Sequence, residues 1–163
     1  MRVACTLERS SLASAAKALR DYADSLAASA SATAARVAEV AASSAKASCP
    51  SSRVTATIGS RQTASGAVAF ANGPMCSPQD GSYEVPLSQL LEFGTGIRGD
   101  AAYGASHGYE VNMSGRGEAG WTYLGDDGEY HHTHGGVAHR FMANGAEEAR
   151  SSVASVAREE FGR

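Results

Sequence analysis

Four histidines that lie close together are the first residues in this sequence that could do chemistry. They are His131, His132, His134 and His139. In an extended strand His132 and His134 project to one face, where two imidazoles can bind zinc or another divalent ion. A third ligand would come from His139, Asp126 or Asp127. The spacing matches no zinc-enzyme signature, so an exposed polar strand is the simpler interpretation and a small metal-dependent enzyme is the alternative.

A glycine pattern is the second candidate for chemistry. Residues 94–99, GTGIRG, match G-x-G-x-x-G letter by letter. A phosphate-binding loop of this kind leaves a buried strand and opens a helix, whose N-terminal amides hold the phosphate. Residues 100–108 are interrupted by glycines and lack helical periodicity, and no acidic residue follows at the spacing of a ribose site. The sequence therefore predicts a loop here, with no helix start and no nucleotide.

The remaining reactive side chains have ordinary explanations. No G-x-S-x-G elbow presents a serine nucleophile. The acidic pairs at 126–127 and 147–148 fit a solvated turn and a solvated helix face. The three cysteines are Cys5, Cys49 and Cys76, and their wide spacing is typical of reduced thiols with a structural or incidental role. We therefore expect no catalytic residue, metal or cofactor.

The composition predicts one folded domain, residues 1–163, with a thin core. Hydrophobic residues make up 43% of the chain, but 32 of them are alanines and only 24 are Leu, Ile, Val or Phe. Alanine buries little area, and a net charge of −3 is small for a disordered chain. We therefore expect a folded subunit that gains stability from contacts with its neighbours.

Charge and hydropathy argue against two classes of protein. A pI of about 5.9 does not suit a protein whose main task is to grip phosphate backbones. No segment approaches the roughly 18 consecutive apolar residues of a membrane span, and residues 1–11 have no apolar signal core. We expect a protein that contacts no membrane and stays in the cytoplasm where it is made.

Two long helices are the strongest local predictions. Residues 9–47 contain no glycine or proline and are rich in alanine, the best helix former. A serine at 10 or 11 would cap this helix, Pro50 would end it, and the serine-rich residues 25–31 leave a break open. Apolar residues at three-and-four spacing predict one buried stripe, formed by Leu12, Leu19, Tyr22, Leu26, Val37 and Val40. A second helix is predicted at 138–161, closed by Gly162.

Strands and turns are predicted between these helices. Residues 53–93 are assigned mainly to strands, with 53–58 and 66–71 as a hairpin and either a strand or a helix around 88–91. Residues 94–120 contain eight of the 18 glycines and predict a long loop. Residues 121–133 predict a second hairpin around the turn 125–128.

Two stretches of the chain carry a resemblance to a known family. Residues 90–96, LLEFGTG, resemble the E-[FY]-G-T signature of the small head-tail connector and tail-completion proteins of long-tailed bacteriophages and prophages. Residues 133–142, THGGVAHRFM, are similar to that family's T-x-G-x-x-A-x-P-F-M ending, and residues 120–123, GWTY, also look alike. Two departures are Arg140, where the family has proline, and residues 51–54, SSRV, where it has T-G-x-L.

The resemblance implies a fold and a role. The fold is an α+β subunit with an N-terminal and a C-terminal helix packed on a small, mainly antiparallel sheet. The role is that of a non-enzymatic virion protein, assembled in the bacterial cytoplasm, which forms a ring, most often six-fold, in the phage neck. Its partners would be copies of itself, an adaptor or stopper ring, and the tail tube or tail terminator. Translocating DNA would touch it only passively.

The resemblance also singles out assembly or structural residues, which are Glu92, Phe93, Gly94, Thr95, Gly96, Phe141 and Met142. Gly94 and Gly96 would adopt backbone conformations that other residues resist. Glu92 either fixes the loop by hydrogen bonds, together with Thr95, or is an exposed carboxylate at the end of an element. The Phe141–Met142 pair anchors the last helix either in its own core or in a neighbour's pocket.

Overall fold

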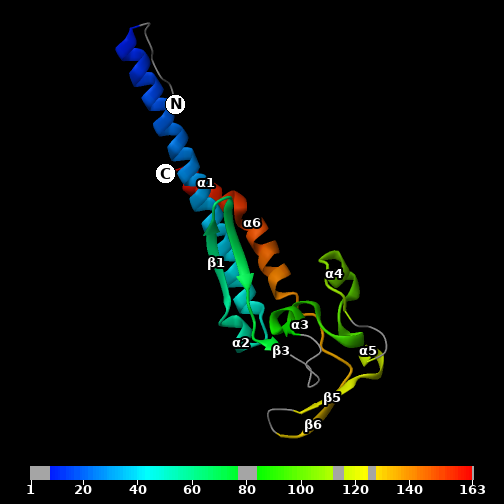
Figure 1. The fold of residues 1–163 in the computed structure, drawn as a ribbon. Helices are drawn as coiled ribbons and strands as arrows, with labels where there is room; N and C mark the ends of the chain where they lie inside the picture. The colour runs from blue at the N-terminus through cyan, green and yellow to red at the C-terminus, as the bar shows by residue number, and fades with distance from the viewer. Residues whose placement is uncertain (1–7, 77–83, 112–115, 125–127, 163) are drawn as a thin grey trace.

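A single helix of 40 residues, α1 (Arg9–Ser48), is the longest element of the molecule (Figure 1). The computed structural model describes residues 8–76, 84–111, 116–124 and 128–162. Helix α1 is continuous through residues 25–31, because alanine supports the helix on both sides of the serines. It ends before Pro50 as predicted, but no serine caps its start, where Glu8 is the N-cap residue and makes no side-chain capping bond.

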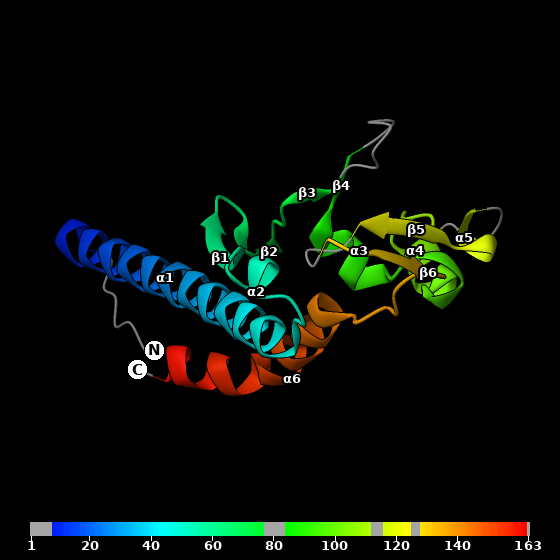
Figure 2. The same ribbon diagram turned by 90° about the horizontal axis from the view of Figure 1, so that it is seen from below.

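The C-terminal helix α6 (Phe141–Phe161) lies antiparallel against the second half of α1 (Figures 1 and 2). The two backbones come so close that a Cβ atom on Gly145 would lie 2.5 Å from the carbonyl oxygen of Ala41. At the other end of the pair Arg36 forms an ion pair of 2.7 Å with Glu160. Helix α6 begins three residues later than predicted, because residues 138–140 are not helical and Arg140, its N-cap residue, has a left-handed backbone.

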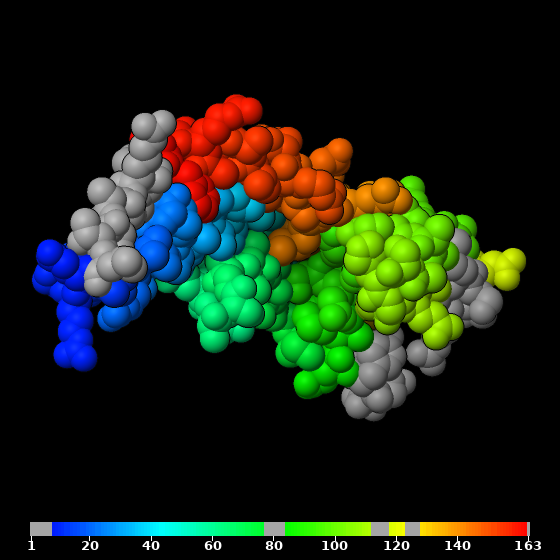
Figure 3. All heavy atoms as spheres, turned by 90° about the horizontal axis from the view of Figure 1, so that it is seen from above, coloured from blue at the N-terminus to red at the C-terminus, as the bar shows by residue number. Residues whose placement is uncertain are grey.

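A β-hairpin covers another face of α1, so that α1 lies between the hairpin and α6 (Figure 3). Its strands are β1 (Ile58–Thr63) and β2 (Gly66–Ala71), paired from Ile58 with Ala71 to Thr63 with Gly66. The prediction placed the first strand at 53–58, which is wrong. The chain forms the short helix α2 (Ser52–Thr55) there, with Ser51 as its extended N-cap, and becomes a strand only at Ile58.

The core is small and lies where α1, α2, β1 and α6 meet. Its buried residues are Ala42, Ala45, Val54, Ile58 and Phe141. Phe141 and Val54 are the two largest side chains among the described residues that are essentially inaccessible to solvent. Two of the five core residues are alanines, so the core is thin, in agreement with the composition.

Short elements form the other end of the molecule, beyond the start of α6 (Figure 2). The predicted loop 94–120 is wrong over much of its length, because helical turns occupy it. Its glycines lie mostly at the ends of these turns, where they close short helices without building long ones. The elements are β3 (Met75–Cys76), β4 (Val85–Pro86), α3 (Leu87–Phe93), η1 (Gly96–Arg98), α4 (Ala101–Ser106), α5 (Arg116–Ala119), β5 (Trp121–Leu124) and β6 (Tyr130–Thr133).

The strands of the described residues form three separate two-stranded antiparallel sheets. The α+β class and the antiparallel pairing were predicted, but the single small sheet was not found. Of the two alternatives for residues 88–91, the structure shows the helix, α3. Strands β5 and β6 form the second predicted hairpin, with Trp121 opposite Thr133, and its turn at 125–127 lies outside the described residues.

The first half of α1 is exposed, which contradicts the predicted buried stripe. Helix α6 ends near Ser29, whose hydroxyl donates to the carbonyl oxygen of Glu160 at 3.0 Å. Residues 9–28, which we call the stem, extend beyond that point (Figure 1). The large apolar side chains of the stem are 39–57% exposed, and they are Leu12, Leu19, Tyr22 and Leu26. Within the described part of the chain, no helix is long and apolar enough to cross a membrane.

Candidate functional site

The two motif stretches of the sequence meet at the start of α6. Backbone hydrogen bonds join them, from the N–H of His139 to the carbonyl of Leu91 at 2.9 Å and from the N–H of Thr95 to the carbonyl of Gly136 at 2.9 Å. Residues 91–95 comprise the end of α3 and the two residues after it, whereas residues 136–139 lie between β6 and α6. Segments about forty-five residues apart in the chain therefore form one structural unit.

The carboxylate of Glu92 is at the centre of this unit and caps α6. Its oxygens accept the backbone N–H groups of Met142 at 2.8 Å and Ala143 at 3.1 Å. These two N–H groups belong to the first turn of the helix, where no intrahelical acceptor exists. The cap residue of a helix normally supplies this acceptor from its own side chain. In this chain the cap residue is Arg140, which cannot, and Glu92 supplies the acceptor instead.

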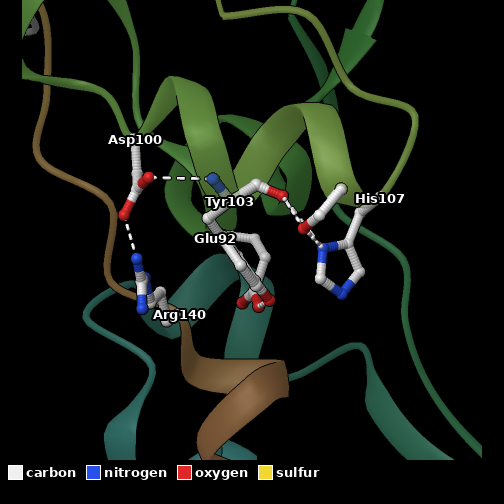
Figure 4. A network of polar contacts seen from close by, with 6 residues as sticks. Glu92, Asp100, Tyr103, His107 and Arg140 are labelled. Carbon is white, nitrogen blue, oxygen red and sulfur yellow. Dashed lines mark hydrogen bonds and ion pairs between the residues drawn. The ribbon is translucent and has the colours of Figure 1, made fainter.

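Tyr103 completes the coordination of the Glu92 carboxylate. Its hydroxyl donates to Oε1 of Glu92 at 2.5 Å (Figure 4). Glu92 is only 6% exposed, and a buried carboxylate is costly unless it is hydrogen-bonded. All three partners are donors, which suits a carboxylate that only accepts, and the positive end of the helix dipole adds to this. The structure thus shows the hydrogen-bonding alternative for Glu92 and not the exposed one.

The phenol of Tyr103 is held in its neutral form. Burial, followed by the hydrogen bond to the Glu92 carboxylate, raises the pKa of Tyr103 well above its ordinary value. The phenol therefore keeps its proton and acts as a hydrogen-bond donor over the physiological range, because the raised pKa makes it a weaker acid. Its ring belongs to an aromatic cluster, with centroids 5.2 Å from Phe93 and 4.5 Å from His107.

An ion pair closes the other side of the unit. The guanidinium of Arg140 binds the carboxylate of Asp100 and also lies over the ring of Tyr103, 4.6 Å from its centroid (Figure 4). Asp100 is in turn the cap of α4, because its carboxylate accepts the N–H of Tyr103 at 2.9 Å. That backbone N–H, and then the guanidinium, lower the pKa of Asp100.

Arg140 has a left-handed backbone conformation, with φ of 50°. It is the one such residue other than glycine among the described residues. The family pattern has proline at this position, and proline fixes φ near −65° and has no N–H. The N–H of Arg140 also donates to the carbonyl of Glu92 at 3.2 Å. Proline would fit neither feature, so the chain enters α6 here in a way that the family pattern does not describe.

Glycines allow the two segments to approach closely. Gly94 has φ of 75° and Gly96 has φ of 59°, so the predicted conformations of both are confirmed. A Cβ atom on Gly94 would lie 2.6 Å from the carbonyl oxygen of Gly136. The Thr95 hydroxyl accepts the N–H of Gly136 at 2.8 Å, which ties the same two segments together.

The last pair of motif residues belongs to the core of its own subunit. Phe141 is fully buried and Met142 packs against the core cluster. The structure therefore shows core anchoring of α6 by these residues. As a whole, the site is a clamp that fixes the first turn of α6 on the segment after α3, and we call it the Glu92 clamp, formed by Glu92, Thr95, Asp100, Tyr103 and Arg140.

The glycine pattern at 94–99 does precede a helix, which corrects the sequence prediction. Helix α4 begins at Ala101, but it has only six residues and its first turn is already capped by the Asp100 carboxylate. A negative charge at that position would repel a phosphate. The element before the pattern is the helix α3 and not a buried strand, so the arrangement differs from a dinucleotide site in both flanks.

The histidine cluster is brought together only in part. His132 and His134 have ring centroids 5.2 Å apart, as the strand spacing predicts. The Nδ1 atom of His134 lies 3.1 Å from the carbonyl oxygen of Glu118, whereas His139 leads into α6. The other candidate ligands, Asp126 and Asp127, lie outside the described residues. Across the residues that the structure describes, no group of three or more His, Cys, Asp or Glu could hold a metal ion.

Cys49 and Cys76 are thiols that form no disulfide, and Cys5 lies outside the described residues. Sequence reasoning missed Asp100 and Tyr103 as members of the clamp. Asp100 before two alanines is an N-cap signal that could have revealed α4. Nothing in the sequence indicates that Tyr103 would reach the Glu92 carboxylate.

Comparison with known proteins adds no further assignment. No protein-family model, no curated protein and no solved structure matches the chain.

Proposed function

We propose that this chain is a virion structural protein, a subunit of a ring in the phage neck that joins the DNA-filled head to the tail. The observation that carries the proposal is the contact of Glu92 with the N–H of Met142. Glu92 belongs to the first motif stretch and Met142 to the second. Two short motifs that matched by chance would have no reason to be in contact.

The distribution of the core supports an assembled role. The buried core cluster of the monomer consists of Phe141 and four small or medium side chains, whereas large apolar side chains of the stem are exposed. A subunit of this kind gains stability when neighbours bind it, because binding to the folded state alone stabilises that state. Rings form by heterologous contacts that close on themselves.

The clamp has a specific part in this proposal. It fixes the angle between α6 and the elements from β3 to β6, which leave the end of the helix pair (Figure 2). Subunits of a closed ring must present two different surfaces at a constant angle. A clamp of hydrogen bonds and an ion pair around one helix start maintains such an angle.

The proposal is tested first on the purified protein. Light scattering after size exclusion, over a concentration series, gives the mass, and a six-fold ring would have a mass of about 100 kDa for chains of 16.7 kDa. Metal analysis on the same peak tests the rival metal-dependent enzyme. A ring without stoichiometric metal supports the proposal, and a monomer with one bound divalent ion contradicts it.

The role in the virion needs a second experiment. In a phage that encodes this chain, inactivation of its gene should yield DNA-filled heads and separate tails, seen by electron microscopy. The protein should be detected by mass spectrometry in intact virions. Normal virions without the protein would contradict a place in the neck.

A further inference from the structure

We propose that the stem of α1 pairs with the stem of a second copy of this chain along its apolar stripe. The stripe consists of Leu12, Ala15, Leu19, Tyr22 and Leu26. This inference concerns a different surface from the Glu92 clamp, and it does not depend on a role in the phage neck.

The spacing of the stripe is that of a coiled coil. Leu12, Leu19 and Leu26 are each seven residues apart, which places them at the a positions of a heptad repeat. Ala15 and Tyr22 take the d positions between them. A strict seven-residue repeat keeps one narrow seam facing a partner helix, whereas a helix that covers a broad core has a wider stripe.

The charges of the stem agree with pairing of like helices. From residue 12 to residue 26 every charged side chain is at a b, c or f position, away from the seam, and these are Lys17, Arg20, Asp21 and Asp24. The e and g positions, which flank the seam, hold only small residues, namely Ala16, Ala18, Ala23 and Ser25. Two copies could therefore approach closely without placing like charges opposite each other.

The seam continues an interface that the structure already shows. The next two d positions are Ser29 and Arg36, and both contact α6 through Glu160. Helix α6 thus occupies the seam at these two positions and ends where the stem begins. Phe161, in the last turn of α6, is 49% exposed at this boundary. A second helix packed on the stem, beyond Phe161, would continue along α1 the packing that α6 provides on the second half of α1.

The exposed part of the seam is long enough for a helix contact. Residues 12–26 span about 21 Å at the rise of an α-helix. Their four large apolar side chains are 39–57% exposed, and exposed apolar surface that is grouped in this way marks an interaction site. A second copy is the occupant that fits, because the stripe is complementary to itself in spacing and in small flanking residues.

The test compares two double variants of the full chain. Leu19→Glu with Leu26→Glu places charges in the seam, and Ser14→Glu with Ala28→Glu places the same charges on the opposite, exposed face. Glutamate is a good helix former, so neither variant should break α1. In sedimentation experiments we expect the seam variant to associate at least tenfold more weakly than wild type, while the control associates as wild type does.

Several results would overturn the inference. These are a wild-type chain that stays monomeric up to about 1 mM, where even weak specific contacts form, and a seam variant that associates like wild type. A seam variant whose monomer unfolds at a lower temperature than the control would also overturn it, because its own chain would then cover the stripe.

Cross-linking gives an independent readout. In a chain whose three native cysteines are serine, Leu19→Cys should form an intermolecular disulfide on oxidation, because position 19 is the centre of the seam in a parallel or an antiparallel pair. Ala28→Cys, on the opposite face, should not. Equal cross-linking of the two variants would contradict pairing along the seam.

The two proposals fail in different ways. If the seam variant forms rings and these rings associate with one another as wild-type rings do, the stem inference fails and the ring proposal does not. If the stems pair but the protein is missing from virions, the proposed function fails and the stem inference stands.

Discussion

Glu92 and Met142, fifty residues apart in the chain, are joined by a hydrogen bond of 2.8 Å between a buried carboxylate and the N–H of a helix's first turn. This bond places an acceptor from one element on the start of another. Helix α6 therefore begins where Glu92 caps it, and this one side chain joins the elements on both sides of the clamp.

Glu92→Gln should destabilise the protein by about 2 kcal/mol, the sum of a weakened helix cap and a poorly satisfied buried group. The amide nitrogen of glutamine is a hydrogen-bond donor, and it would lie opposite one of the three groups that donate to the Glu92 carboxylate, so that bond would be lost. Urea unfolding followed by circular dichroism measures the change. Glu147→Gln, on the exposed face of α6, is the matched control and should change stability by less than about 0.5 kcal/mol. Equal stability of the two variants would contradict the clamp.

Gly94→Ala should be far more damaging than Gly108→Ala. Both glycines have positive φ, 75° at Gly94 and 71° at Gly108, and the ψ of −176° at Gly94 places it in a region that is essentially limited to glycine. The added Cβ would meet a carbonyl oxygen at 2.6 Å in Gly94 and nothing within 4 Å in Gly108. We expect a loss of about 1 kcal/mol for Gly108→Ala, from backbone strain alone, and more than about 3 kcal/mol for Gly94→Ala. Thermal unfolding of both variants measures the combined effect of the steric clash and the stronger backbone strain at Gly94, and similar losses would show that the two segments can move apart.

Stability should decrease at alkaline pH because of Tyr103. Its pKa is raised above the ordinary value of 10.0 when the chain folds. Below pH 10 both states keep the proton and the contribution of Tyr103 is complete. As pH rises above 10 the unfolded state loses its proton first. The free energy of unfolding therefore falls as the pH approaches the raised pKa of the folded state. Urea unfolding between pH 8 and pH 11 measures the slope.

Two variants isolate this pH effect from that of the other tyrosines. Tyr103→Phe should have a flatter alkaline profile than wild type, because it removes the group with the raised pKa. Tyr130→Phe changes a tyrosine that is 74% exposed, and it should keep the wild-type slope. A Tyr103→Phe profile parallel to wild type would assign the alkaline loss to another group.

Arg140→Pro should destabilise the protein by about 3 kcal/mol, although the family pattern has proline there. The ring cannot adopt φ of 50°, and the hydrogen bond to the carbonyl of Glu92 would be lost. Arg140→Gly accepts the left-handed backbone, so the relief of strain should offset much of the lost ion pair with Asp100. Differential scanning calorimetry compares the two. If the Arg140→Pro variant proved as stable as the Arg140→Gly variant, the segment before α6 would be able to adopt the conformation of the family pattern.

Much of the secondary structure was predicted from the sequence, and the errors have local causes. Helices α1 and α6 and the strands of both hairpins follow from alanine content, spacing and turn residues, which act within a few positions. The first strand was placed five residues too early, because the alternation of apolar and polar residues at 53–58 is also compatible with a helical turn after Pro50. Residues 94–120 were assigned to a loop, because glycines conceal short helices that they only terminate.

The sequence by itself determined the α+β class, the long helices and the special glycines, since each depends on the conformational preference of a short segment. Only the tertiary structure decided that Glu92 caps α6, that Tyr103 and Arg140 surround it, and that the stem leaves its stripe exposed. Whether an apolar stripe is buried depends on where its partner ends, and α6 ends at Phe161, beside Ser29. Such contacts join residues far apart in the chain, and local sequence patterns do not predict them.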